Sequence, residues 1–191
     1  VLGSRGLGDV YKRQLSFQNV KVVPFLGTPG AIQSDSWNTT TYSNTLATKV
    51  GNLLHCASYN LSAPMYVEGT KEKELIESID EIAKVLHMAE TADIALIGIG
   101  SMQDDSSIIK AEIRTKEEYK ELVRKGAVGE IVGRIYDKNG QTVDEDLKRK
   151  MVGISLDKIA KIPVRVGMSY GKDKIEAIKG AIAGGLVNVL V

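Results

Sequence analysis

Three glycine-bearing segments each follow a short apolar run and carry residue types that can hold an anionic ligand. They are FLGTPG at Phe25–Gly30, GIGSMQDD at Gly98–Asp105 and SYGKDK at Ser169–Lys174. Glycine lets the backbone approach a ligand closely, and N–H groups at the start of a following helix can point at an anion. The hydroxyl of Thr28 adds a donor, so the sequence predicts one ligand site that includes Gly27, Thr28, Gly98 and Gly100. The alternative for each segment is that a strand-to-helix turn needs glycine for its geometry alone.

The third segment places Lys174 in the first turn of a predicted helix, where the helix dipole is positive. An anion held between the ammonium group and the helix N–H groups would remove this conflict. We therefore predict that Lys174 and the helix N-terminus jointly bind one phosphate. The alternative is a solvated lysine that pairs with Asp173 or Glu176.

A glutamate lies in the glycine-spaced segment KGAVGEIVGRIYDKNG, at Lys125–Gly140. A carboxylate near a sheet edge can accept hydrogen bonds from sugar hydroxyls or act as a general base. This favours Glu130 as a ligand contact, and the alternative is an exposed glutamate at a strand end.

The sequence offers little for catalysis by cofactor, metal or nucleophile. A dinucleotide motif would need a third glycine where Gln103 stands. No Ser-His-Asp or Cys-His arrangement is evident, and His55 and His87 fall within helical patterns. One cysteine and two histidines leave little for a zinc site, and Cys56 is expected to be a buried small residue rather than a reactive thiol. We predict no catalytic residue, no metal and no cofactor.

The 191-residue chain has 25 basic and 24 acidic residues and a net charge of +1. This balance excludes a strong overall attraction to nucleic acid or to an anionic membrane surface. No run approaches the about 18 apolar residues that a membrane span requires. The composition therefore predicts a cytoplasmic protein without a membrane partner.

Short β-like runs alternate with helical patterns from Leu15 onward. Extended segments are expected at Val20–Leu26, Tyr59–Val67, Ala92–Gly100, Glu130–Gly140, Ile162–Tyr170 and Leu186–Val191. Helices are expected within Asn38–Cys56, Lys71–Glu90 and Lys116–Arg124, and in a last helix that carries Ile175, Ile178 and Ile182 and ends at Gly184–Gly185. The alternation predicts an α/β fold: an open, mostly parallel sheet with helices on both faces, which binds ligands at the carboxyl ends of its strands.

Apolar spacing indicates which faces should be buried. The continuous apolar run Ala92–Gly100 is typical of a strand buried on both faces. The predicted inward side chains of two helices are Leu46, Val50, Leu53 and Leu54 in the first, and Tyr119, Leu122 and Val123 in the third. An Asn-Gly turn at Asn139–Gly140 could form a hairpin with the residues that follow it.

The opening segment Val1–Gln14 has no sustained periodicity and is expected to be a non-native leader. The domain is therefore expected to occupy residues 15–191, and both of its ends are expected to be cut.

In order along the chain, VVPFLGTPG, LSAPMYV, ADIALIGIG, GAVGEIVGRIYDKNG and the segment from VGISLDK to NVLV resemble the sugar-binding effector domain of SorC-family bacterial transcriptional regulators. The resemblance covers nearly all of residues 20–191. It implies a fold similar to glucosamine-6-phosphate deaminase, ribose-5-phosphate isomerase and CoA transferases. It also implies that Gly27, Thr28, Glu130 and Lys174 contact a sugar or sugar phosphate.

The resemblance also implies that parts of the regulator are absent from this chain: the N-terminal helix-turn-helix domain, a first Gly-Thr-rich phosphate loop and the last helix. The family usually has two adjacent glycines where this chain has Gly27–Gly30, and some members have an arginine at Leu26. The expected function is a non-enzymatic effector domain that forms a homo-oligomer, dimer or tetramer, and controls DNA binding through the absent domain. The alternative is a sugar-phosphate isomerase or deaminase with Glu130 as its base.

Overall fold

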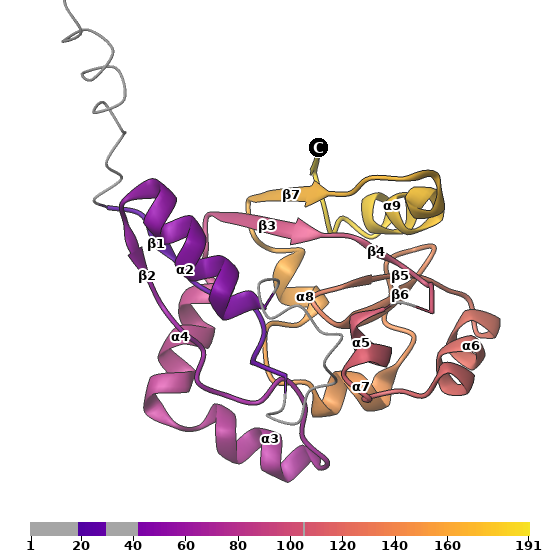
Figure 1. The fold of residues 1–191 in the computed structure, drawn as a ribbon, viewed down its shortest axis with the longest axis horizontal. Helices are drawn as coiled ribbons and strands as arrows, with labels where there is room; N and C mark the ends of the chain where they lie inside the picture. The colour runs from indigo at the N-terminus through magenta and orange to yellow at the C-terminus, as the bar shows by residue number, and fades with distance from the viewer. Residues whose placement is uncertain (1–18, 30–41, 105) are drawn as a thin grey trace, which may run out of the picture.

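The computed structural model describes residues 19–29, 42–104 and 106–191, and these form an α/β fold (Figure 1). The strands are β1 (Lys21–Val22), β2 (Ala57–Ser58), β3 (Ile94–Gly98), β4 (Gly100–Ser101), β5 (Ala127–Ile131), β6 (Arg134–Asp137), β7 (Val164–Met168) and β8 (Val189–Leu190). The helices are α2 (Ser43–Leu54), α3 (Thr70–Glu77), α4 (Asp80–Glu90), α5 (Ser107–Lys110), α6 (Lys116–Arg124), α7 (Glu145–Lys150), α8 (Leu156–Ile159) and α9 (Ile175–Ala183), with a 3₁₀ turn, η2, at Lys172–Lys174. The predicted α/β class is confirmed.

The longest parallel ladder has the order β3-β7-β8, and β1 pairs with β2 in a separate parallel ladder. In the pairing of β3 with β7, the register runs from Ile94 opposite Val164 to Gly98 opposite Met168. Parallel neighbours need a crossover, and α9 supplies the one between β7 and β8. The predicted strand-helix alternation is therefore present in this part of the chain.

The remaining strands form an antiparallel ladder in the order β4-β5-β6, which the sequence predicted only in part. Val132 and Gly133 both have positive φ, 50° and 66°, as a tight turn between β5 and β6 requires. The predicted Asn-Gly turn follows β6: Gly140 has φ 73°, and Tyr136 forms an antiparallel bridge with Thr142. The second turn was predicted from its Asn-Gly pair, and the first was not.

The prediction that β3 is buried on both faces is wrong within the described residues. Ala95 and Ile97 are 0% and 1% exposed, whereas Ile94 and Leu96 are 58% and 54% exposed. Successive side chains of a strand point to opposite faces, so only one face of this ladder is covered by the described elements. A continuous apolar run cannot distinguish these two situations.

Small residues form most of the buried face of α9, together with the partly buried Ile178, which packs against the core. Ala177, Gly180 and Ala181 are buried, while Ile175 and Ile182 are 48% and 54% exposed. A Cβ on Gly180 would lie only 2.8 Å from the carbonyl oxygen of Asp137. The helix therefore approaches the β5-β6 hairpin too closely for a larger side chain.

The first predicted helix face differs for the same reason. In α2 the buried residues are Ala47 and Gly51, while Leu46 and Leu53 are 46% and 76% exposed. A Cβ on Gly51 would lie 2.7 Å from the Cβ of Ser58 in β2. Close approach again selects the smallest residues for the interface.

The other predicted helices are confirmed, with one wrong inward residue in α6. Tyr119 and Leu122 are 2% and 7% exposed, but Val123 is 44% exposed. The segment predicted at residues 71–90 contains two helices, α3 and α4. Ile82 lies on the buried face of α4. No helix among the described residues is long and apolar enough to cross a membrane.

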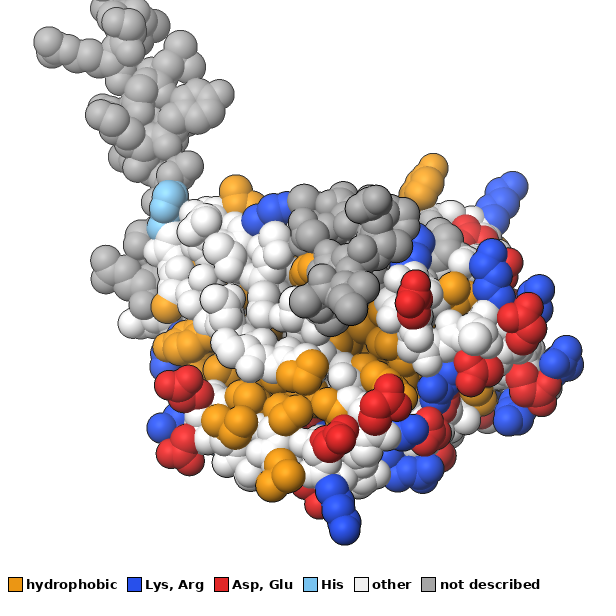
Figure 2. All heavy atoms as spheres, turned by 60° about the horizontal axis from the view of Figure 1, so that its bottom comes forward, with side chains coloured by type: hydrophobic (Ala, Val, Ile, Leu, Met, Phe, Trp, Pro, Cys, Tyr) orange, Lys and Arg blue, Asp and Glu red, His pale blue; other side chains and the backbone are white. Residues whose placement is uncertain are grey.

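Acidic and basic side chains alternate around one face of the molecule, with apolar side chains gathered between them (Figure 2). This mixture agrees with the balanced charge of the sequence, since neither sign dominates that face.

Candidate functional site

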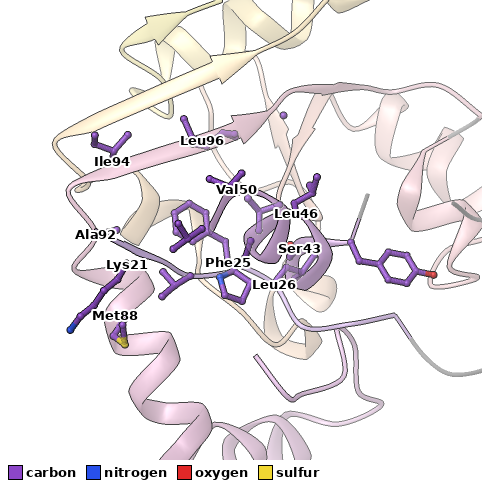
Figure 3. Close-up of a pocket in the computed structure, with 18 of the residues that line it drawn as sticks. Lys21, Phe25, Leu26, Ser43, Leu46, Val50, Met88, Ala92, Ile94 and Leu96 are labelled. Atoms are coloured by element: carbon purple, nitrogen blue, oxygen red, sulfur yellow. The ribbon is translucent and has the colours of Figure 1, made fainter. Parts of the chain in front are cut away.

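A cavity of about 970 Å³ opens between α2, the segment that follows β1, and β3. Figure 3 shows Leu46 and Val50 of α2 and Phe25 of the β1 segment near Leu96 of β3. Four of the predicted site residues line this cavity, namely Gly27, Gly98, Gly100 and Glu130. Most of its wall is apolar, and its charged lining residues are Glu130, Lys21 and Asp93.

The Glu130 side chain is buried, at 9% exposure, and two hydroxyl groups hold it. Ser106 Oγ donates to Glu130 Oε2 at 2.5 Å, and the Tyr119 hydroxyl donates to the same oxygen at 3.2 Å. Burial therefore excludes the alternative of an exposed strand-end glutamate. A buried carboxylate that keeps its hydrogen-bond partners is a stable acceptor for further donors.

The antiparallel register brings β4 beside this carboxylate. Gly100 lies opposite Glu130, and a Cβ on Gly100 would lie 3.3 Å from Glu130 Cγ. Glycine at this position therefore lets the two strands approach closely, and a Cβ would make a tight contact with the glutamate. Gly98 differs, since a Cβ there would meet nothing within 4 Å.

Lys174 lies at the end of η2 and forms the N-cap of α9. Its Nζ donates to Ser101 Oγ at 3.0 Å and lies 3.6 Å from Asp173 Oδ2, while Ser101 Oγ donates to that same Asp173 oxygen at 2.9 Å. The hydrogen bond from Ser101, followed by the nearby charge of Lys174, lowers the pKa of Asp173. The predicted alternative partner, Asp173, therefore contacts the lysine in this structure.

The candidate site has two parts, one around Glu130 and one around Lys174, and they lie on opposite faces of the β4-β5 ladder. Gly100 and Glu130 face α5 and α6, whereas the next pair, Ser101 and Gly129, faces α9. Adjacent residues of a strand alternate in this way, with a rise of about 3.4 Å per residue. Lys174 is thus joined to the cavity through β4 and does not line the cavity itself.

The backbone of the Gly27 segment is already paired. Gly27 N–H donates to the carbonyl of Val152 at 3.1 Å, and Thr28 N–H donates to that of Ala63 at 2.8 Å. The Thr28 hydroxyl accepts from Asn44 Nδ2 at 3.0 Å. A Cβ on Gly27 would lie 2.5 Å from the Pro64 carbonyl oxygen, so this glycine is needed for packing. Gly30, the end of the predicted loop, lies outside the described residues.

Sequence reasoning missed Ser106 and Tyr119 as partners of Glu130. Tyr119 was expected to face inward, and a buried phenol needs a hydrogen-bond acceptor, which was the available signal. Ser106 had no signal, because its contact depends on where the turn before α5 ends.

The other titratable residues singled out in the sequence do not join this site. Asp104 forms an exposed pair with Lys116 at 3.8 Å, and Asp105 lies outside the described residues. His55 ends α2 with a φ of 50°, and His87 is exposed on α4. Within residues 19–29, 42–104 and 106–191, no group of three His, Cys, Asp or Glu side chains could hold a metal ion.

Comparison with known proteins gives consistent matches. The Sugar-bind family model, which describes a sugar-binding domain, matches residues 7–191. The transcriptional regulator LsrR of Escherichia coli O9:H4 (strain HS) is 35% identical over 148 residues, which are 75% of this chain and 47% of that protein. The LsrR of Enterobacter sp. (strain 638) is 32% identical over 139 residues, 71% of this chain and 43% of that protein.

Solved structures superpose on most of the chain. The full-length sorbitol operon regulator SorC from Klebsiella pneumoniae gives a TM-score of 0.82 at 26% identity, over 94% of this chain and 56% of that one. A DeoR family transcriptional regulator from Listeria monocytogenes gives 0.80 at 26% identity, over 93% of this chain and 68% of that one. The chain spans about half the length of the curated relatives it matches.

Proposed function

The chain belongs to the sugar-binding domain family of SorC-type transcriptional regulators, and from this premise we propose that it binds a phosphorylated sugar as a regulatory effector. The relatives are regulators, which does not favour the alternative of an isomerase or deaminase with Glu130 as its base. The observation that carries the proposal is the register of β4, which sets Gly100 against Glu130 and the next residue, Ser101, against Lys174.

The sugar would occupy the part of the cavity beside Gly98, Gly100 and Glu130. A carboxylate only accepts hydrogen bonds, so it suits the hydroxyl groups of a carbohydrate. Gly98 leaves open space at the carboxyl end of β3, where ligands of parallel α/β sheets bind. The Gly27 segment forms the facing wall and would contribute through its shape, because its N–H groups are already paired.

The phosphate would lie at the end of β4, where Lys174 can reach it. The lysine side chain is 25% exposed, and its present partners are the buried hydroxyl of Ser101 and the half-exposed carboxylate of Asp173. A phosphate would replace Asp173 as the anion beside the ammonium group. The N-terminus of α9 would add to this attraction.

In the longer regulator, we propose that effector binding controls DNA binding by a separate N-terminal domain, in a cytoplasmic homo-oligomer. An effector can do so only by binding more tightly to one of two arrangements of the protein. The dimer or tetramer expected from the resemblance would supply those arrangements.

The test is the thermal stability of this chain with a panel of pentose and hexose phosphates, in wild type and in Lys174→Ala. A charge-assisted hydrogen bond contributes about 1.5–3 kcal/mol, so the variant should bind about ten to a hundred times more weakly. Lys179→Ala is the matched control, because it removes the same charge from α9, where Lys179 pairs with Glu176 at 2.8 Å and is exposed. Equal binding by wild type and Lys174→Ala would overturn the phosphate assignment. No shift with any panel member would overturn the effector proposal.

A further inference from the structure

We propose that Ser106 and Tyr119 are positioning residues for Glu130, which fix its carboxylate in the orientation that recognises ligand hydroxyl groups. The inference rests on the proposed function and adds to it the residues that give the sugar end its selectivity. Neither residue lines the cavity, whereas Glu130 does. They would therefore act through Glu130 and without touching the ligand.

The three side chains come from different elements and meet in the interior. Ser106 precedes α5, Tyr119 lies on α6 and Glu130 on β5, with exposures of 8%, 2% and 9%. Both hydroxyls donate to one oxygen, Oε2, at 2.5 and 3.2 Å. Two donors on one carboxylate oxygen restrict the terminal torsion of the glutamate, which is otherwise broad.

The backbone also holds the Ser106 hydroxyl, which donates to Glu130 because an ionised carboxylate can only accept. The N–H of Ile108 donates to Ser106 Oγ at 3.2 Å, so this oxygen already accepts a hydrogen bond. Its own hydrogen is then directed to Glu130 Oε2. The start of α5 thus orients the serine, and the serine orients the carboxylate.

The position of Tyr119 is also fixed, by the start of its helix and by packing of its ring. It lies one turn into α6, whose N-terminus is closed by a capping box: Thr115 Oγ1 accepts from Glu118 N–H at 3.2 Å, and Glu118 Oε2 accepts from Thr115 N–H at 2.8 Å. Its ring packs in a cluster with Leu122 and Ile135. The fixed ring places the phenol oxygen 3.2 Å from Glu130 Oε2.

Fixed orientation matters because the site must distinguish a sugar from a simple anion. A buried group prepared to accept a ligand hydroxyl discriminates strongly against ligands that lack it. A carboxylate free to rotate would lose part of that preference through its disorder. Loss of either positioning hydroxyl should therefore weaken binding of the sugar and leave binding of phosphate alone unchanged.

The experiment measures the affinity of this chain for ribose 5-phosphate, glucose 6-phosphate and inorganic phosphate, by calorimetry. Tyr119→Phe and Ser106→Ala are compared with Tyr136→Phe, a buried tyrosine whose hydroxyl donates instead to the Ala177 carbonyl at 2.9 Å. We expect Tyr119→Phe and Ser106→Ala to weaken the tighter sugar phosphate about tenfold and to leave inorganic phosphate within about twofold. The control should change neither affinity.

A second set of variants separates positioning from general damage to the fold. If Tyr119 acts through Glu130, then Tyr119→Phe should have no further effect on sugar affinity in a Glu130→Gln background. Additive losses in the double variant, or an equal loss with Tyr136→Phe, would overturn the inference. So would unchanged sugar affinity in both single variants. Absence of sugar-phosphate binding by the wild type would overturn the proposed function, and this inference with it.

Discussion

Substitution of Arg114 by methionine should destabilise the domain, because it leaves the buried carboxylate of Asp144 without its cationic partner. Arg114 Nε donates to Asp144 Oδ2 at 2.9 Å, and its Nη2 donates to Asp144 Oδ1 at 3.1 Å and to Asp146 Oδ2 at 2.9 Å. The Arg114 and Asp144 side chains are 11% and 7% exposed. Burial disfavours the arginine charge, but hydrogen bonds to Asp144 and Asp146 outweigh burial and raise the pKa of the guanidinium.

The magnitude follows from what each carboxylate would keep. Removing one partner of a buried pair costs about 3–5 kcal/mol. Asp144 would retain the N–H of Leu147 at 2.9 Å, and Asp146, 45% exposed, would retain Lys150 at 3.1 Å. We therefore expect the lower limit, about 3 kcal/mol, or a fall in Tm of about 6–12 °C for a domain of this size.

The assay is thermal and urea unfolding followed by circular dichroism, with Arg124→Met as the control. Arg124 pairs with Glu121 at 2.6 Å on the surface of α6, where the two side chains are 70% and 47% exposed. Solvent screens such a pair, so the control should unfold like the wild type. Equal Tm values for Arg114→Met and Arg124→Met would refute the claim that burial makes the first pair important.

Two further predictions concern the α9 face of the hairpin. Gly129→Ala should destabilise the domain by about 1–3 kcal/mol, since the added Cβ would lie 2.5 Å from the Tyr136 hydroxyl and 2.7 Å from Ala177 Cβ. Gly98→Ala is its control and should leave the free energy of unfolding unchanged in the same assay, because a Cβ there meets nothing within 4 Å. Burial, and then the charge of Glu130, raise the pKa of Tyr136 above its ordinary value of 10.0. The neutral phenol is thus favoured in the folded state, and its contribution is complete below pH 10 and lost as pH rises beyond it. The stability difference between wild type and Tyr136→Phe should therefore begin to shrink near pH 10 and keep shrinking as the pH rises further, and a constant difference above pH 10 would contradict the assignment.

The sequence predicts the order of elements well because that order depends on local patterns. Apolar runs that end in glycine identify β3 and β7, and Gly184–Gly185 marks the end of α9, where Gly185 has a φ of 65°. Which face of a helix is buried depends instead on how closely its neighbour approaches. The α9 interface uses Ala177 and Gly180, and no hydrophobic pattern gives these more weight than the isoleucines beside them.

In the candidate site, too, the residues in local sequence patterns were predictable and the contacts made by tertiary packing were not. Glycine segments at strand ends could be recognised from the sequence, and four of the predicted residues do line one cavity. The contacts of Glu130 could not, since Ser106 and Tyr119 are 24 and 11 residues away from it and meet it only through tertiary packing. The Lys174 pair with Asp173 was foreseeable because the two are neighbours in sequence.

Under the proposed function, the short strand β4 would transmit effector binding through the domain. Gly100 lines the cavity and the next residue, Ser101, contacts Lys174. The two parts of the candidate site are therefore adjacent along β4 but lie on opposite faces of the ladder. A phosphate that draws Lys174 away from Asp173 and Ser101 would break the hydrogen bond from Lys174 to Ser101, which ties β4 to the start of α9, and would leave the hydrogen bond from Ser101 to Asp173 in place. Since α9 also packs on Tyr136 and Gly129, the sugar and phosphate ends of one ligand would act on both faces of the same hairpin. The free energy available for a conformational change is then the difference in ligand affinity between the state in which Asp173 holds the lysine and the state in which the phosphate does.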